Sequence, residues 1–255
     1  MKLILFAIIV CSFLISPNLL FMAGVGYSST GGGMVEKIHL ATYLAIIGFV
    51  LQFALRKKNK LGYMQDAEVY RYIGATALLA IYCVAMGYVS SIPIVTLMTP
   101  LLIYSIVQHT DKKFVARLGV VIRIILVANA SLGIAEALGG FTLLERVAGD
   151  VVVLSDTRAI GFVGHPLTSS LLSALMAIYL IREATEARFT MFRAAELMVH
   201  LVGLIAFGGR VALVLTIVLA IWAVLFGKAK PGGGRKLRSS QIALRVGLFG
   251  AFVVG

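Results

Sequence analysis

Charged residues are scarce in this chain. They make up 13% of its 255 residues, whereas 60% are hydrophobic and the mean hydropathy is +0.99. Soluble globular domains usually carry about a quarter charged residues and are about half apolar. The composition therefore excludes an ordinary soluble domain. Because apolar segments recur along the whole chain with short gaps between them, we expect one integral membrane domain over residues 1–255.

Cysteine is also rare, and no cleavage signature follows the first apolar run. The two cysteines, Cys11 and Cys83, both fall inside apolar stretches, where cysteine usually acts as a small buried residue. Their placement indicates neither a disulfide framework nor a metal site, and no cofactor is expected. The apolar run after Lys2 continues to about Met22 without an Ala-x-Ala pattern. We therefore expect a retained first helix rather than a secretory signal.

The apolar stretches are long enough for membrane helices, which need roughly 20 residues to cross about 30 Å of hydrocarbon. Pro93 and Pro100 predict a kink in the fourth stretch. A ninth stretch begins near Ile242 and is too short to cross before Gly255. We predict an all-α polytopic transmembrane helix bundle of about eight complete helices and an incomplete ninth, with the C-terminal remainder missing. The eight segments are Leu3–Met22, Lys37–Leu55, Tyr72–Ser90, Ile92–Val107, Leu118–Leu138, Gly161–Ile181, Phe189–Phe207 and Val211–Phe226.

The formal net charge of +12 is explained by the positions of the basic residues. A basic surface can bind nucleic acid, but these residues cluster in short segments between apolar stretches. Lys and Arg are retained on the cytoplasmic side of membrane helices, so we predict a cytoplasmic N-terminus and no nucleic-acid partner. The cytoplasmic loops would carry Arg56, Lys57, Lys58, Lys60, Arg71, Lys112, Lys113, Arg117, Arg182, Arg188, Arg193, Lys228, Lys230, Arg235, Lys236 and Arg238, and the opposite loops Lys37, Arg146, Arg158 and Arg210.

Several ionisable residues fall at membrane depth, where each costs about 2.5–3.5 kcal/mol on insertion scales. Arg123 lies one to two turns inside its segment, and we expect its side chain to extend to the cytoplasmic surface. Glu196 and His200 are spaced i, i+4 on one helix face, and Arg193 precedes Glu196 by three residues. This spacing predicts a structural polar cluster near the inner end of the helix. We expect Glu136 to lie at the outer interface.

The outer side holds one long segment, residues 139–164, with Arg158 near its end. Gly164-His165-Pro166 then opens the sixth apolar stretch, and Gly208-Gly209-Arg210 opens the eighth. Both helices would present their N-termini to the outer surface, where free N–H groups and a partial positive charge favour anions. Arginine pairs bidentately with phosphate oxygens. These features predict a site for a multiply charged anion, with His165 as a further donor or proton-transfer group. In the alternative reading, both arginines are interfacial anchors and His165 only caps a helix.

The same residues carry a family resemblance. Arg158-Ala-Ile-Gly-Phe-Val-Gly-His165-Pro166-Leu167, followed later by Phe207-Gly208-Gly209-Arg210-Val211-Ala212-Leu213, resembles the O-antigen ligase and polymerase family of bacterial membrane proteins. In that family an Arg, a Gly and a His-Pro or Asn-Pro open one helix, and a Ser-Arg-Gly-like step opens a later one. Gly209 departs from this pattern, since Ser is commoner there, as does Leu167, where Asn often follows the proline. The family's large outer loop, which usually bears a functional histidine, would lie beyond Gly255.

The resemblance implies an activity at the periplasmic face of the bacterial inner membrane. The family polymerises or ligates glycans carried on polyprenyl diphosphate, as in O-antigen and exopolysaccharide synthesis. By similarity, Arg158 and Arg210 would bind the diphosphate, supported by Gly164, His165 and Gly209, without a metal. The catalytic group stays unassigned, with His165 as a candidate. The partners would be the lipid-linked oligosaccharide, membrane lipid and other membrane proteins of polysaccharide assembly.

Two other functions are compatible with the sequence. A transporter or flippase for an anionic or lipid-linked solute would use Arg123 and the Glu196–His200 pair as its pathway, because buried charges often mark one. A non-catalytic membrane subunit would use its outer segment, residues 139–164, to bind a partner.

Overall fold

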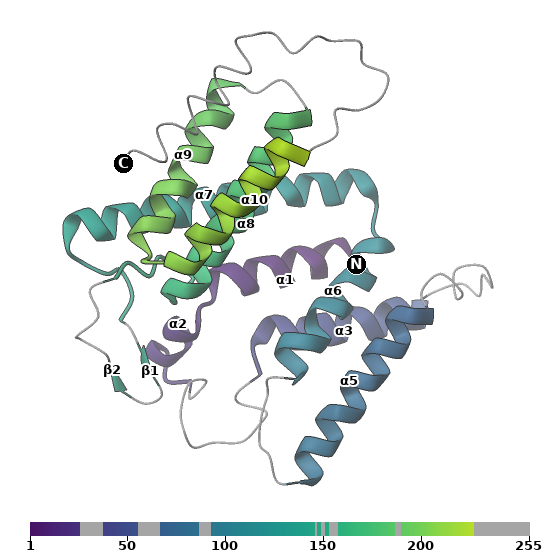
Figure 1. The fold of residues 1–255 in the computed structure, drawn as a ribbon. Helices are drawn as coiled ribbons and strands as arrows, with labels where there is room; N and C mark the ends of the chain where they lie inside the picture. The colour runs from purple at the N-terminus through teal and green to yellow at the C-terminus, as the bar shows by residue number, and fades with distance from the viewer. Residues whose placement is uncertain are drawn as a thin grey trace, which may run out of the picture.

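The computed structural model describes residues 1–25, 38–55, 67–86, 93–145, 147–148, 151–152, 158–186 and 190–226. These residues are helical almost throughout, so the predicted helical fold is confirmed (Figure 1). A pair of two-residue antiparallel strands in the outer segment was not predicted. The elements are α1 (Lys2–Leu14), α2 (Pro17–Met22), α3 (Leu40–Leu55), α5 (Ala67–Ala85), the π-helix η1 (Pro93–Met98), α6 (Thr99–Gln108), α7 (Lys112–Gly139), β1 (Val147–Ala148), β2 (Val151–Val152), α8 (Pro166–Glu186), α9 (Met191–Ala206) and α10 (Arg210–Phe226).

The first apolar segment, predicted as one helix over Leu3–Met22, is broken into α1 and α2. Ser16 adopts an extended backbone conformation, and its Oγ accepts a hydrogen bond from the N–H of Leu19 at 3.1 Å. Pro17 follows at the first helical position, which needs no N–H donor. The single-helix prediction was wrong because a helix-start signal lies inside the apolar run.

The fourth segment is not a regular α-helix, as its prolines predict. It begins as the π-helix η1 and continues as α6. The Thr99 side chain lies at the junction, with its Oγ1 3.0 Å from the carbonyl oxygen of Ile94 and 3.0 Å from Oγ1 of Thr42. The predicted ninth segment, from Ile242, lies outside the described residues.

Two hydrophobic clusters hold the helices together, and α7 contributes to both. The first joins α1, α3, α6 and α7, and the second joins α7, α8 and α9. Small residues bring α7 and α9 close, since a Cβ built on Gly203 would lie 3.1 Å from the Cβ of Ala130. The buried members are Leu5, Ile8, Ile9, Ala41, Ala45, Leu102, Ile106 and Leu118 in the first cluster, and Leu126, Ala174, Met176, Ala177, Leu180, Leu197, Leu201 and Leu204 in the second.

The two ends of the bundle differ in what they carry. At one end, Lys2 Nζ lies 3.4 Å from Asp111 Oδ2, which brings the starts of α1 and α7 together. The opposite end carries α2, β1, β2 and the starts of α8 and α10 (Figure 1). Following the predicted topology, we call the first the inner end and the second the outer end.

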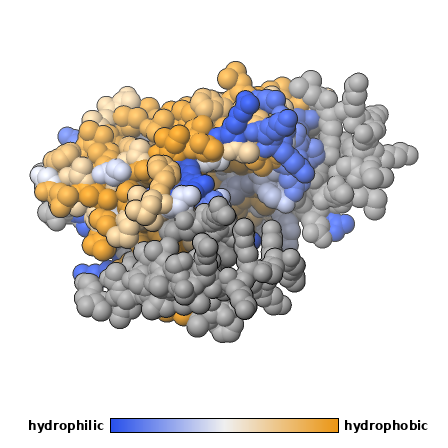
Figure 2. Space-filling view, turned by 90° about the horizontal axis from the view of Figure 1, so that it is seen from above, coloured by the Kyte–Doolittle hydropathy of each residue, from blue (hydrophilic) through white to orange (hydrophobic). Residues whose placement is uncertain are grey.

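Two described helices are long and apolar enough to cross a membrane, by length and composition: α7 and the Pro166–Ala184 part of α8. Their most apolar windows are only 28% and 39% buried within the protein. Five further apolar helices are shorter, Lys2–Leu14, Leu40–Gln52, Arg71–Ala85, Thr99–Gln108 and Arg210–Ile221. Hydrophobic side chains accordingly cover much of the described surface in the view of Figure 2.

Candidate anion-binding site

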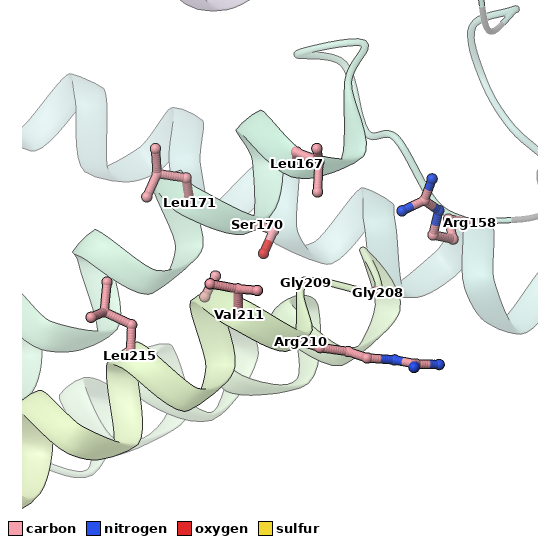
Figure 3. Close-up of a pocket in the computed structure, with 10 residues that line it drawn as sticks. Arg158, Leu167, Ser170, Leu171, Gly208, Gly209, Arg210, Val211 and Leu215 are labelled. Atoms are coloured by element: carbon pink, nitrogen blue, oxygen red, sulfur yellow. The ribbon is translucent and has the colours of Figure 1, made fainter.

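A cavity of about 580 Å³ lies between the first turns of α8 and α10, at the outer end. Both arginines that the sequence singled out line it, Arg158 from the segment before α8 and Arg210 at the first position of α10 (Figure 3). The predicted meeting of these two distant residues is therefore present in the structure. The remaining lining residues are Leu167, Ser170, Leu171, Gly208, Gly209, Val211, Ala212 and Leu215.

A tight turn between α9 and α10 sets the position of Arg210. The N–H of Gly208 donates to the carbonyl of Ile205 at 2.9 Å, and the N–H of Gly209 donates to the carbonyl of Leu204 at 3.2 Å. Together with the left-handed φ of +66° at Gly208, this is a Schellman ending of α9. α10 starts directly afterwards, and the N–H of Arg210, its first residue, donates to the carbonyl of Gly208 at 3.0 Å.

Gly208 also makes room for Arg158. A Cβ built on Gly208 would lie 2.8 Å from Cδ and 3.4 Å from Cγ of Arg158, so the aliphatic part of this arginine lies against the bare glycine backbone. Gly208 was not among the residues predicted to support the site, although it stands in the Gly208-Gly209-Arg210 step that opens α10. The contact ties the turn before α10 to the segment before α8.

Gly209 brings α8 and α10 into close contact on the cavity floor. A Cβ built on Gly209 would overlap the Oγ of Ser170, which means that no larger residue fits there with the present packing. Ser170 is 1% exposed, and its Oγ has no hydrogen-bond partner in the described part of the chain. The two residues are neighbours in Figure 3, where the serine oxygen points toward α10.

Glu136 of α7 holds the segment that carries Arg158. Its carboxylate is 2% exposed and accepts hydrogen bonds from the N–H groups of Leu143 at 2.9 Å, Ile160 at 2.8 Å and Gly161 at 2.8 Å. Such charge-assisted bonds stabilise a buried carboxylate. Glu136, which was expected toward the outer interface, lies near the outer end of α7 and is buried there by backbone donors that periodicity does not reveal.

Gly164 and His165, predicted to support the anion site, do not line the cavity. Gly164 has a φ of +80°, and its carbonyl accepts a hydrogen bond from Asn18 Nδ2 at 2.8 Å. A Cβ on Gly164 would lie 2.8 Å from the Cβ of Ser16. His165 is exposed, and its carbonyl accepts the N–H of Ser169 at 3.0 Å. Gly164 thus helps to join the start of α8 to α2, and His165 accepts the first backbone hydrogen bond at the start of α8.

The cavity has a largely apolar wall, with Arg158 and Arg210 beside it. Both arginines adjoin the cavity near the N-terminus of α10, which itself favours anions, and the Arg210 side chain extends away from Ser170 (Figure 3). None of the described residues that line the cavity is acidic. The rest of the wall is formed largely by exposed leucine and valine side chains: Leu167, Leu171, Val211 and Leu215. This arrangement suits a ligand with an anionic group joined to a hydrocarbon part.

A second polar cluster lies toward the inner end, between α7, α8 and α9. Nε and Nη2 of Arg123 donate hydrogen bonds to the two carboxylate oxygens of Glu196. The guanidinium group of Arg193 lies 3.1 Å from a carboxylate oxygen of Glu183 and 3.8 Å from one of Glu196. The predicted association of Arg193 with Glu196 is present, and Glu183 joins it. The expectation that Arg123 extends to the cytoplasmic surface was wrong, because an ion pair to α9 holds it. His200 is fully buried, and neither ring nitrogen has a hydrogen-bond partner among the described residues.

Within the described residues, no three His, Cys, Asp or Glu side chains group as a metal site. The side-chain hydrogen-bond donors among the described residues that line the cavity are the guanidinium groups of Arg158 and Arg210 and the hydroxyl of Ser170. Comparison of the chain with protein families, with curated proteins and with solved structures gives no match.

Proposed function

We propose that this chain is a multi-pass membrane protein that polymerises or ligates glycan carried on polyprenyl diphosphate at the periplasmic face of the bacterial inner membrane. The cavity between α8 and α10 binds the lipid diphosphate. One observation carries the proposal: Arg158 and Arg210, which lie in separate parts of the sequence, line a single cavity whose other wall is apolar.

The placement in a membrane is supported by apolar helix surfaces that the protein itself leaves uncovered. The core helix of a soluble protein would be mostly buried, whereas the apolar windows of α7 and α8 are buried to 28% and 39%. Large hydrophobic side chains such as Ile124, Leu175 and Val214 are exposed on α7, α8 and α10. A hydrocarbon environment would cover these surfaces. The shorter apolar helices would then be further spans, with the basic loops on the cytoplasmic side.

The chemistry follows from where the charges lie. In glycan transfer, an acceptor hydroxyl oxygen bonds to the anomeric carbon, and the bond from that carbon to the diphosphate oxygen breaks. The electron pair leaves with the diphosphate, while a base takes the hydroxyl proton. Arg158 and Arg210 would hold the diphosphate through bidentate, charge-assisted hydrogen bonds and stabilise the charge that develops on it. The polyprenyl chain would lie along Leu171 and Leu215 toward the lipid. The base is not assigned.

The test is binding and activity of the full-length protein with Arg158→Ala and Arg210→Ala. Each variant should insert normally, bind farnesyl diphosphate at least tenfold more weakly in detergent, and form no polymer or ligated glycan in cells. Lysine at either position should restore little, because it lacks the planar fork. Arg117→Ala, which removes an exposed arginine at the inner end, is the matched control. Wild-type binding and polymer from both cavity variants would rule the proposal out.

A transporter or flippase is the second candidate, and the buried His200 favours it, because an unpartnered imidazole inside a helix bundle is a group a transported proton or polar solute can use. In the cluster beside His200, however, Arg123 and Arg193 form ion pairs with Glu196 and Glu183. Paired charges of this kind are explained more simply as a structural contact between helices than as a transport pathway. Movement of a lipid-linked glycan across liposomes by the purified protein, without a new glycosidic bond, would favour this candidate. Loss of that movement in His200→Ala would locate the pathway.

A further inference from the structure

The hydroxyl of Ser170 is a buried polar group beside the cavity that has no hydrogen-bond partner in the described part of the chain. Ser170 is 1% exposed and lines the cavity. A buried hydroxyl without a partner is unfavourable, so such a group calls for an explanation. A ligand that enters the cavity and accepts a hydrogen bond would provide one.

Neighbouring serines on α8 show that this state is particular to Ser170. The hydroxyl of Ser169 donates to the carbonyl of Ile160 at 2.8 Å and thereby fixes the segment before α8. Ser173 is buried one turn further along and does not line the cavity. Of the three, Ser170 alone combines burial, a place in the cavity wall and an unused hydroxyl.

The position of Ser170 relative to α10 indicates what it would bind. Gly209 is the residue before the first position of α10, where a side chain that accepts backbone N–H bonds is usually found. Gly209 has no side chain, and a Cβ on it would overlap Ser170 Oγ. The Ser170 hydroxyl of α8 thus lies where a side chain at the start of α10 would be. The N–H of Arg210 already donates to the carbonyl of Gly208 at 3.0 Å, so the hydroxyl is the donor at this point that has no partner among the described residues.

We propose that Ser170 donates a hydrogen bond to a phosphate oxygen of the bound ligand, as a third side-chain donor beside Arg158 and Arg210. The positive end of α10 lies beside this hydroxyl, and Gly209 permits the close approach of the two helices. The assignment rests on the proposed function for the identity of the anion as the diphosphate of a lipid carrier. The ligand chemistry itself, a phosphate or diphosphate group, is shared with a free anion.

The experiment measures binding to the full chain in detergent by calorimetry, with two probes: farnesyl diphosphate and inorganic diphosphate. Ser170→Ala removes the donor, and Ser170→Cys replaces the hydroxyl with a somewhat larger group that is only a weak donor. Both should bind farnesyl diphosphate about tenfold or more weakly, as expected for loss of a hydrogen bond to a charged group. Ser173→Ala is the matched control and should bind as the wild type does. A wild-type preference for farnesyl over inorganic diphosphate identifies the lipid-linked anion as the ligand.

The outcomes separate this inference from the proposed function. If Arg210→Ala loses binding while Ser170→Ala and Ser170→Cys retain wild-type affinity, the hydroxyl is not a ligand donor and the lipid-diphosphate site stands. Equal losses in the Ser170 and Ser173 variants would also overturn the inference, because they indicate a packing effect. If the wild-type chain binds neither probe, both the site and the Ser170 assignment fail. Should Ser170→Ala not fold, Ser170→Cys decides, because it leaves no void at this position and still lacks a strong donor.

Discussion

Arginines occupy both ends of this bundle, but their surroundings differ. At the inner end, Arg123 and Arg193 lie within ion-pair distance of Glu183 and Glu196, and the side chain of Glu196 is 3% exposed. At the outer end, Arg158 and Arg210 line a cavity in whose described lining no carboxylate appears. An ion pair buried between helices contributes to how those helices pack, whereas an arginine beside a cavity also acts on what enters the cavity. The two ends should therefore respond differently to the same kind of substitution.

The largest expected effect is on stability, at the inner end. Arg123→Ala leaves the buried carboxylate of Glu196 with only the longer contact to Arg193 at 3.8 Å, and an unpaired buried charge costs about 3–5 kcal/mol. The variant should lose that much free energy of unfolding in detergent while the folded fraction binds farnesyl diphosphate normally. Replacing Arg123 and Glu196 together with leucine and methionine should recover most of the loss. Weaker binding with unchanged stability would contradict the assigned structural role.

Glu136→Ala should lower both the free energy of unfolding and the affinity for diphosphate, which makes it a sharper probe of the outer end. It removes the acceptor of three N–H groups, two of them from Ile160 and Gly161 next to Arg158. Each buried donor left unsatisfied costs about 1–3 kcal/mol, and we expect about 3 kcal/mol in total together with a loss of affinity as Arg158 is released. Thermal unfolding and diphosphate binding measure the two effects. Glu145→Ala, an exposed acidic residue of the same outer segment, should change neither.

The positions of the helices were largely predictable, because the apolar segments mark where the helices run and the basic residues mark the loops between them. The observed helices follow the predicted segments closely, and the one predicted helix that is broken contains Ser16 and Pro17, a start signal that outweighs hydrophobicity locally. That all of these helices cross a membrane stays a prediction. Two of the described helices are long and apolar enough to do so, and five other apolar helices are shorter. Shorter helices cannot be read as spans from length alone.

The site was predictable only in part. Arg158, Gly209 and Arg210 come together because each adjoins the start of a helix at the outer end, which sequence position reveals. The hydrogen bonds from backbone N–H groups to Glu136 and the packing of Ser170 against Gly209 depend on tertiary contacts between segments that are distant in the sequence. No spacing rule encodes them. The same holds for Glu183, which joins the inner cluster from a third helix.

A smaller effect is expected from Gly208→Ala, and the chain offers a matched control. Gly208 has a φ of +66° and touches Arg158, whereas Gly140 has a φ of +64° with nothing within 4 Å of a built Cβ. Both alanine variants should lose about 1–2 kcal/mol from backbone strain. Only Gly208→Ala should also weaken farnesyl diphosphate binding, because its methyl group displaces Arg158. Equal affinity in the two variants would show that this contact does not position the arginine.

The smallest expected effect is a pH dependence at the inner end, outside the proposed spans. The backbone N–H of Lys113 lowers the pKa of Asp111, and Lys2 lowers it further. Because the folded pKa lies below the usual value of about 4, Asp111 contributes stability above that pH. The contribution is lost as pH falls through the folded pKa. Asp111→Asn retains an acceptor for the Lys113 N–H but carries no charge, so its thermal midpoint should change less than that of the wild type as the buffer is acidified. Diphosphate binding at the outer end, measured in parallel at neutral pH, should be the same in both proteins, since Asp111 lies at the other end of α7 from the segment that Glu136 holds.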